Sequence, residues 1–150
     1  MSQEPLVPGD FEVPRELRTA RFRLEPLGPQ HNAADLAAWM SSISHIQSTP
    51  GFEERNWPPD EGYSAEANLA DLVQHAEEFE QRVAFAYTVL RPEVDDVIGC
   101  LYLNPGQRPG AVDVRSWVRA DVADLDVVLR QAVREWLAQR WPFDEVVYAG

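Results

Sequence analysis

Four side chains on three predicted strands are of types that can bind a substrate or move a proton. They are Tyr87, Tyr102, Arg115 and Trp117. A tyrosine hydroxyl can exchange a proton, and a guanidinium group can hold an anion through several N–H donors. If the strands are neighbours in a sheet, these side chains can line one cleft. The competing interpretation places the aromatic ones in the core, where such side chains bury most of their surface.

The longest irregular stretch, residues 44–62, holds a second group of candidates. It combines prolines and glycines with Phe52 and Trp57. Binding residues concentrate in loops on a rigid scaffold, so His45, Arg55 and Trp57 are candidates for lining a substrate cleft. The alternative is a packed lid, because aromatic residues in an ordered loop bury themselves against the domain.

Histidine and cysteine are too few and too scattered to predict a metal site. His31, His45 and His75 lack a metal-ligand spacing such as His-x-x-x-His, and Cys100 is the only cysteine. Cys100 lies on a predicted central strand with no histidine near it in sequence, which favours a buried small side chain over a nucleophile. We therefore predict no metal ion and no internal disulfide.

Residues 111–150 carry the clearest secondary-structure pattern, a strand, a helix and a second strand. Small apolar residues alternate with polar or aromatic ones between 111 and 118, as in a strand with two different faces. Residues 146–148 form the second strand, which the connection length makes a parallel neighbour of the first. The helix between them has an apolar stripe that predicts packing against a sheet: Leu125, Val128, Leu129, Ala132, Val133, Trp136 and Leu137.

The preceding elements can also be read from hydrophobic spacing. Residues 21–27 predict a strand, two helices follow, and residues 85–90 and 97–103 predict a hairpin. Ser64 is suited to cap the second of these helices. Its predicted inner stripe consists of Leu69, Leu72, Val73, Ala76, Phe79 and Val83.

This order of elements resembles the GNAT superfamily of N-acetyltransferases. Residues 17–24, Leu-Arg-Thr-Ala-Arg-Phe-Arg-Leu, are similar to the opening Leu-Arg-Thr-x-Arg-Phe/Leu-Arg-Leu of the branch that acetylates ribosomal proteins and aminoglycosides. The resemblance implies an α/β (α+β) fold with a central mixed sheet of about five strands and helices on both faces. It covers residues 15–150 as a single domain, and residues 1–14, rich in proline, are expected to be a flexible arm.

The chain departs from the family at the loop that holds acetyl-CoA. The resemblance places Arg/Gln-x-x-Gly-x-Gly/Ala there, whose backbone amides bind the pyrophosphate at the start of a helix. Here the matching stretch, residues 123–128, contains no glycine and no cation. Asp121 and Asp124 are suited to cap the following helix, where they would occupy the amides that a phosphate needs. The altered loop consists of Asp121, Ala123, Asp124, Asp126 and Val128.

Two functions follow, and the sequence leaves both open. The first is a GNAT-like domain that has lost ordinary acetyl-CoA binding, with a dissociation constant weaker than about 1 mM, and serves as a small-molecule-binding or interaction module. No cofactor is then expected. The alternative is a divergent N-acetyltransferase that moves an acyl group from acyl-CoA to an amine. The sequence also ends at Gly150, without the helix and two strands that usually follow in the family.

Composition limits the partners. The net charge of −12 argues against nucleic acid and anionic membranes, which attract a basic surface. The sequence has no leader and no apolar run near 18 residues, so we expect a cytoplasmic protein. If the chain is complete, residues 146–148 form an apolar sheet edge, which predicts a homodimer or a folded-back N-terminal arm.

Overall fold

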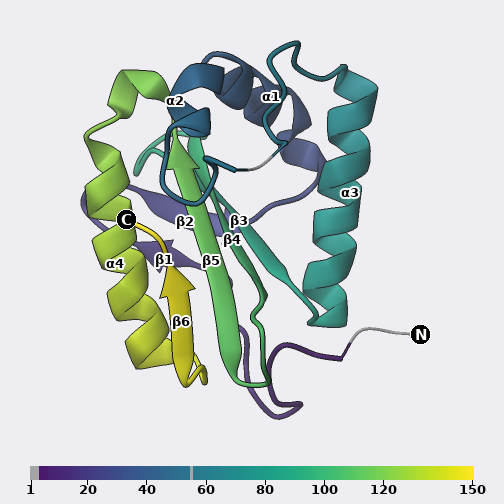
Figure 1. Ribbon diagram of the computed structural model, residues 1–150, viewed down its shortest axis with the longest axis vertical. Helices are drawn as coiled ribbons and strands as arrows, with labels where there is room; N and C mark the ends of the chain where they lie inside the picture. The colour runs from purple at the N-terminus through teal and green to yellow at the C-terminus, as the bar shows by residue number, and fades with distance from the viewer. Residues whose placement is uncertain (1–3, 55) are drawn as a thin grey trace.

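The computed structural model describes residues 4–54 and 56–150, which build a six-stranded mixed sheet with helices on both faces (Figure 1). The strands cross the sheet in chain order: β1 (Leu17–Arg18), β2 (Arg23–Pro26), β3 (Phe85–Leu90), β4 (Val97–Pro105), β5 (Ala111–Val118) and β6 (Glu145–Tyr148). Neighbouring strands are antiparallel, except that β5 and β6 are parallel. The predicted α/β class and the parallel pair are confirmed.

The sheet has one strand more than the five or so expected. The additional strand is β1, in which Leu17 pairs with Leu24 of β2. A turn joins the two strands, and the hydroxyl of Thr19 accepts hydrogen bonds from the backbone N–H groups of Arg21 and Phe22. A two-residue strand is too short to produce a visible alternation, so sequence periodicity could not separate it from β2.

The helices divide the core into two layers. The long helix α4 (Leu125–Arg140) covers one face of the sheet, where Leu129 and Val133 are fully buried. The other face is covered by α1 (Asn32–Met40), α2 (Ile43–Gln47) and α3 (Ala65–Gln81), with Trp39 at the centre of that layer. Two 3-10 turns, η1 (Pro29–His31) and η2 (Ala120–Val122), precede α1 and α4.

The inner face of α3 is more polar than its sequence predicts. Ser64 caps the helix as expected and accepts a hydrogen bond from the N–H of Ala67 at 3.1 Å. The predicted stripe is wrong in part, because Leu69 and Val73 are 40% and 39% exposed. The helix instead turns Asn68 into the core. The amide of Asn68 is satisfied there by side-chain hydrogen bonds, which makes its burial tolerable.

The expected arm packs against the domain from residue 4 onward. The N–H of Leu6 donates to the carbonyl oxygen of Arg82 at 2.7 Å, and the Arg82 guanidinium donates to the carbonyl oxygens of Pro8 and Phe11. The Phe11 ring contacts Trp141 with 5.4 Å between centroids. The described part of the arm thus lies against the ends of α3 and α4, and it does not pair with β6.

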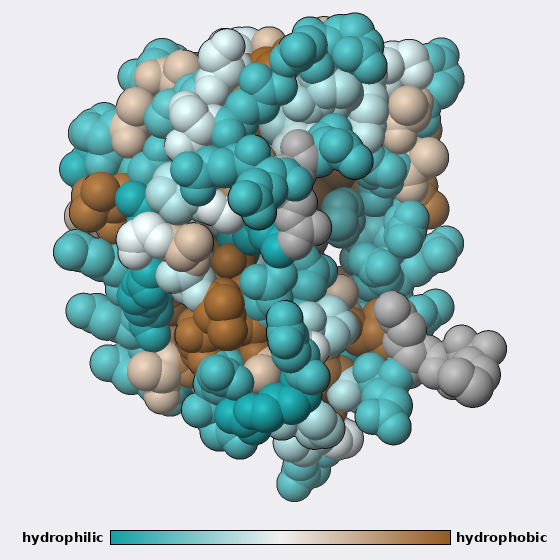
Figure 2. All heavy atoms as spheres, viewed as in Figure 1, coloured by the Kyte–Doolittle hydropathy of each residue, from teal (hydrophilic) through white to brown (hydrophobic). Residues whose placement is uncertain are grey.

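The parallel pairing of β5 with β6 covers only the first half of β5. Their pairing ends at Val114 and Tyr148, so residues 115–118 of β5 extend beyond the end of β6 (Figure 1). Val146 and Val147 of β6 are 38% and 52% exposed, and Figure 2 shows an apolar patch over this strand. Among the described residues no strand pairs with the outer edge of β6.

Candidate functional site

The structure brings three of the candidate aromatic residues together. Trp57 lies 6.5 Å from Tyr102 and 6.3 Å from Trp117, measured between ring centroids. The indole N–H of Trp117 donates to the Tyr102 hydroxyl at 3.0 Å. Gly99 of β4 permits this packing, because a Cβ there would clash with the carbonyl oxygen of Trp117. Trp117 is fully buried, whereas Trp57 and Tyr102 keep part of their surface exposed.

Tyr87 does not belong to this cluster, because it lies in the core, the competing interpretation of the aromatic candidates. It lies on the opposite face of the sheet, where its ring packs 5.4 Å from Trp136 of α4. Its hydroxyl donates to the carbonyl oxygen of Pro14 at 2.6 Å. Side chains alternate between the two faces of a strand, and Tyr87 pairs with Leu101 of β4, whereas Tyr102 pairs with Ala86, so Tyr87 and Tyr102 lie on opposite faces.

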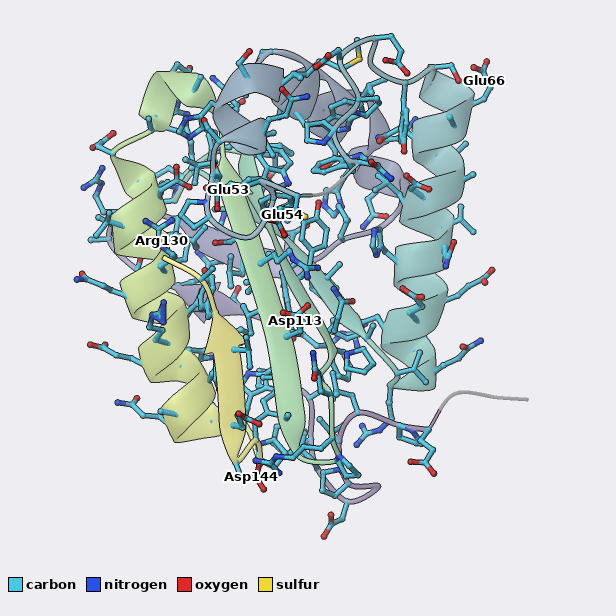
Figure 3. All side chains as sticks on the ribbon, viewed as in Figure 1. Glu53, Glu54, Glu66, Asp113, Arg130 and Asp144 are labelled. Carbon is cyan, nitrogen blue, oxygen red and sulfur yellow. The ribbon has the colours of Figure 1, made fainter. Side chains whose placement is uncertain are left out.

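The other predicted site residues, Arg115, His45 and Arg55, are not part of the aromatic cluster. Arg115 shares the sheet face of Trp117, but it forms an ion pair with Asp113 at 2.7 Å and lies under the loop at Gly51, near Glu53 and Glu54 (Figure 3). His45 points the other way, toward the start of α4. Arg55 lies outside the described residues.

The carboxylates before and within the first turn of α4 are each bonded to a nitrogen atom of another side chain. Asp121 pairs with Arg119 at 2.6 Å, Asp124 with Arg21 at 3.1 Å, and Asp126 with the Nε2 of His45 at 2.7 Å. Burial raises the pKa of the Asp126 carboxyl above its ordinary value, and the bond to His45 works against that shift. Among the described residues, no side chain caps η2 or α4. Asp124 is the N-cap residue of α4, one of the two expected candidates, but the expected side-chain capping bonds are not formed, because Asp121 and Asp124 each pair with an arginine.

The apolar side chains of this loop largely turn away from its surface. Leu125 is 2% exposed and belongs to the core, and Val122 and Val128 pack against the same core. Ala123 is exposed and contributes only a methyl group. Just before this loop, the backbone N–H of Ala120 donates a hydrogen bond to the Ser42 hydroxyl at 2.8 Å.

A half-buried arginine that the sequence did not single out lies beside this segment. Figure 3 shows Arg130 on the side of α4 that faces β6. Its charge acts on both Asp126 and Tyr148, and it forms no hydrogen bond or ion pair with another described side chain. In the sequence, Arg130 follows Asp126 by one helical turn, and this spacing could have indicated a cation close to the altered loop.

Two hydroxyl groups meet where β5 and β6 separate. Ser116 Oγ and the Tyr148 hydroxyl lie 2.5 Å apart, and both residues are buried. Burial raises the pKa of Tyr148 to about 12, so its hydroxyl stays protonated at neutral pH. Arg134 donates to the carbonyl oxygens of Tyr148 and Gly150, which fixes this end of β6 against α4.

The described part of the chain contains no group of three or more His, Cys, Asp or Glu side chains placed to hold a metal ion. Across residues 4–54 and 56–150, no helix is both long and apolar enough to cross a membrane.

Three features define the fold of this protein. They are the strand order of the sheet, the parallel strands β5 and β6 that separate after Val114 and Tyr148, and the helix α4 that begins near this separation. Solved structures that match this architecture include GNAT acetyltransferases, so the chain has the GNAT fold that its sequence resembles. Among them is the ribosomal L7/L12 α-N-protein acetyltransferase RimL, with a TM-score of 0.70 and 16% identity over 91% of this chain and 75% of that one. Another is the ribosomal-protein-S5-alanine acetyltransferase of Vibrio fischeri, with a TM-score of 0.62 and 15% identity over 81% of this chain.

The likeness is one of fold. The chain spans 66% of the length of the Vibrio fischeri protein. No family model matches the sequence, and no curated protein sequence matches it.

Proposed function

We propose that this chain is an acyl-CoA-dependent N-acyltransferase domain, which moves an acyl group from acyl-CoA to an amine. The fold supports this proposal, since it is shared with ribosomal-protein acetyltransferases, one of which was solved in complex with coenzyme A at a TM-score of 0.69. The observation that carries the proposal is the uncapped start of α4, which lies at the end of β5 where β5 and β6 diverge.

The residues at the start of α4 suit a diphosphate better than the bare sequence suggests. A helix start offers unpaired N–H groups and a partial positive charge. The neighbouring carboxylates of Asp121 and Asp124 are paired with arginines, which reduces their repulsion of an anion, and Asp126 is hydrogen-bonded to His45. We propose that the amides around Ala123 and Asp124, with the guanidinium of Arg130, hold the diphosphate. The bound acyl-CoA would supply the activated thioester.

The chain's own hydroxyls would then act as donors rather than as bases. With its pKa raised to about 12, Tyr148 cannot accept a proton from an amine at neutral pH, but it can donate a hydrogen bond. Ser116 holds the Tyr148 hydroxyl in place. An amine acceptor must therefore lose its proton to another group or to water.

An acyl-transfer assay tests the proposal. The wild-type protein is incubated with acetyl-CoA and a panel of primary amines, and the acetylated product is detected by mass spectrometry. We expect acetylation of at least one amine class above the protein-free rate. Arg130→Gln should raise KM for acetyl-CoA about tenfold, because it removes a charge-assisted contact. Arg140→Gln, at the exposed far end of α4, is the matched control and should leave KM unchanged.

A second function has one specific observation in its favour. The loop of Asp121, Ala123, Asp124, Asp126 and Val128 has no glycine, and glycine is what allows a backbone to approach a phosphate closely. A GNAT-fold domain that serves as a small-molecule-binding or interaction module would show no transfer to any amine and no binding of acetyl-CoA.

The partner and compartment proposals follow from the charge and the single cysteine. We propose a cytoplasmic homodimer that does not bind nucleic acid or membranes. The net charge of −12 disfavours both polyanionic partners, and the buried thiol of Cys100 is compatible with a reducing compartment.

A further inference from the structure

A cavity lies between α1, α3 and β4, closed on one side by the loop that carries Trp57. Its volume is about 300 Å³, at the small end of the range for ligand sites. Its walls include Asp35 of α1, His75 of α3, Tyr102 of β4 and Trp57. The cavity therefore combines a carboxylate with aromatic surfaces.

The carboxylate of Asp35 is buried and only half satisfied. The residue is 4% exposed, and its Oδ2 accepts a hydrogen bond from the Asn68 amide at 3.2 Å. Its Oδ1 has no hydrogen-bond partner among the described residues. The Asn68 amide cannot rotate to satisfy Oδ1 of Asp35, because two other hydrogen bonds hold it. Its Oδ1 accepts from the Trp39 indole at 3.0 Å, and its Nδ2 donates to Asn32 at 2.8 Å. The Oδ1 atom of Asp35 is therefore an unsatisfied hydrogen-bond acceptor among the described residues.

No described side chain forms an ion pair with this carboxylate, although the nearby His31 acts to lower its pKa against the larger effect of burial. No arginine is among the described residues that line the cavity, and the sequence contains no lysine. His75 stays neutral near pH 7, because burial lowers its pKa. His31 bonds to Glu25 at 2.9 Å and accepts from the Gly28 N–H. Asp71, also on the cavity wall, adds a second negative charge.

The aromatic walls suit the same kind of ligand. The faces of tryptophan and tyrosine attract cations within about 6 Å of the ring centroid. Trp57 and Tyr102 both line the cavity, and the His75 ring packs 5.6 Å from Tyr102. A neutral polar ligand would leave the Asp35 charge uncompensated, and an anion would be repelled by two carboxylates.

We propose that this cavity binds a small organic cation, an ammonium group on a short apolar body, with the charge at Asp35 Oδ1 and the apolar part against Trp57 and Tyr102. The site uses no residue from the start of α4. Its binding can be measured without acyl-CoA, although a protonated amine is also the form in which the acceptor of the proposed acyl transfer would arrive.

Calorimetry on the wild-type protein without acyl-CoA tests the proposal, with benzylammonium and the uncharged benzyl alcohol as probes. We expect benzylammonium to bind at least tenfold more tightly than benzyl alcohol at pH 7.5. Asp35→Asn should remove that preference and leave the binding of benzyl alcohol unchanged. Glu77→Gln, on the exposed side of α3, is the matched control and should behave as wild type. Equal affinities for the two probes, or no binding of benzylammonium, would overturn the proposal.

A pH series keeps the proposal testable if Asp35→Asn does not fold. Burial raises the pKa of Asp35 to about 6, so the affinity of the wild type for benzylammonium should fall as the pH drops through 6. His75, whose pKa is lowered by burial, also gains charge at low pH, whereas Cys100 and Tyr102, with pKa values raised by burial, stay neutral. His31 and Asp71 are the other titratable groups that act on the Asp35 carboxyl. The fall should persist in His75→Gln. An affinity independent of pH between 5 and 7.5 would contradict the role of Asp35.

Discussion

Asp35 is a buried residue whose charge weakens the fold. A buried carboxylate without a countercharge is costly, since burial disfavours the ionised form. Asp126, also buried, avoids much of this cost by pairing with His45 at 2.7 Å. Asp35 accepts its one hydrogen bond among the described residues from the neutral amide of Asn68 and forms no ion pair there. This difference makes Asp35 the residue at which stability and binding should oppose each other.

We predict that Asp35→Asn stabilises the protein at neutral pH. The pKa of Asp35 rises from 3.8 to about 6 on folding, so the folded state favours the protonated carboxyl. That contribution to stability is complete below pH 3.8 and is lost as the pH rises through 6. The loss amounts to about 3 kcal/mol, at about 1.4 kcal/mol per pH unit. Asparagine does not titrate and avoids it.

Urea unfolding at pH 4 and pH 8 measures this effect. The free energy of unfolding of Asp35→Asn relative to wild type should rise by about 3 kcal/mol between the two pH values. Glu77→Gln provides the baseline for an exposed acid. The same relative stability of Asp35→Asn at both pH values would show that Asp35 is not strained by burial.

At the scale of elements, the sequence predicts helices with strong apolar periodicity and misjudges those with polar inner faces. The α4 stripe was predicted in full, because Leu129, Val133 and Trp136 recur at helical spacing. The inner face of α3 was not, since Asn68 and His75 look like surface residues in a sequence. Only their tertiary hydrogen bonds and ring contacts explain their burial. The candidate cavity was missed for the same reason.

The position of Trp136 on α4 leads to a prediction about stability. It is 6% exposed and packs against Tyr87 and Trp141, with centroids 5.4 and 5.5 Å away. Trp136→Ala should lower the free energy of unfolding by about 3 to 5 kcal/mol, because it leaves a cavity in the core. Val127→Ala, at a 53% exposed position of the same helix, should change it by less than about 0.5 kcal/mol. Similar melting temperatures for the two variants would contradict the packing of α4.

At the scale of the whole molecule, the sheet edge at β6 leads to a prediction about assembly. Val146 and Val147 are exposed on a strand whose outer edge is unpaired among the described residues, and such edges invite pairing with another chain. We expect a homodimer by light scattering. Val147→Arg should shift it toward monomer, because the new charges would face each other across the joined edges. A wild-type monomer at high concentration would rule this interface out.

The order of the elements was predictable, but the electrostatics of the site were not. Residues distant in sequence set them: Arg21 reaches Asp124, and His45 reaches Asp126. Local sequence showed three carboxylates at the start of a helix and suggested repulsion of a phosphate. The partners of these carboxylates are Arg21, which lies just before β2, and His45 of α2. They weaken the expectation that the carboxylates repel a phosphate.

Acetyl-CoA binding, measured by isothermal titration calorimetry at low salt, tests the central claim most directly, because low ionic strength preserves any charge effect at the start of α4. The proposed N-acyltransferase should bind acetyl-CoA with a dissociation constant tighter than about 1 mM, and Arg130→Gln should weaken binding about tenfold. A folded wild-type protein that binds more weakly than about 1 mM would contradict the proposal and favour the binding module without acyl-CoA chemistry.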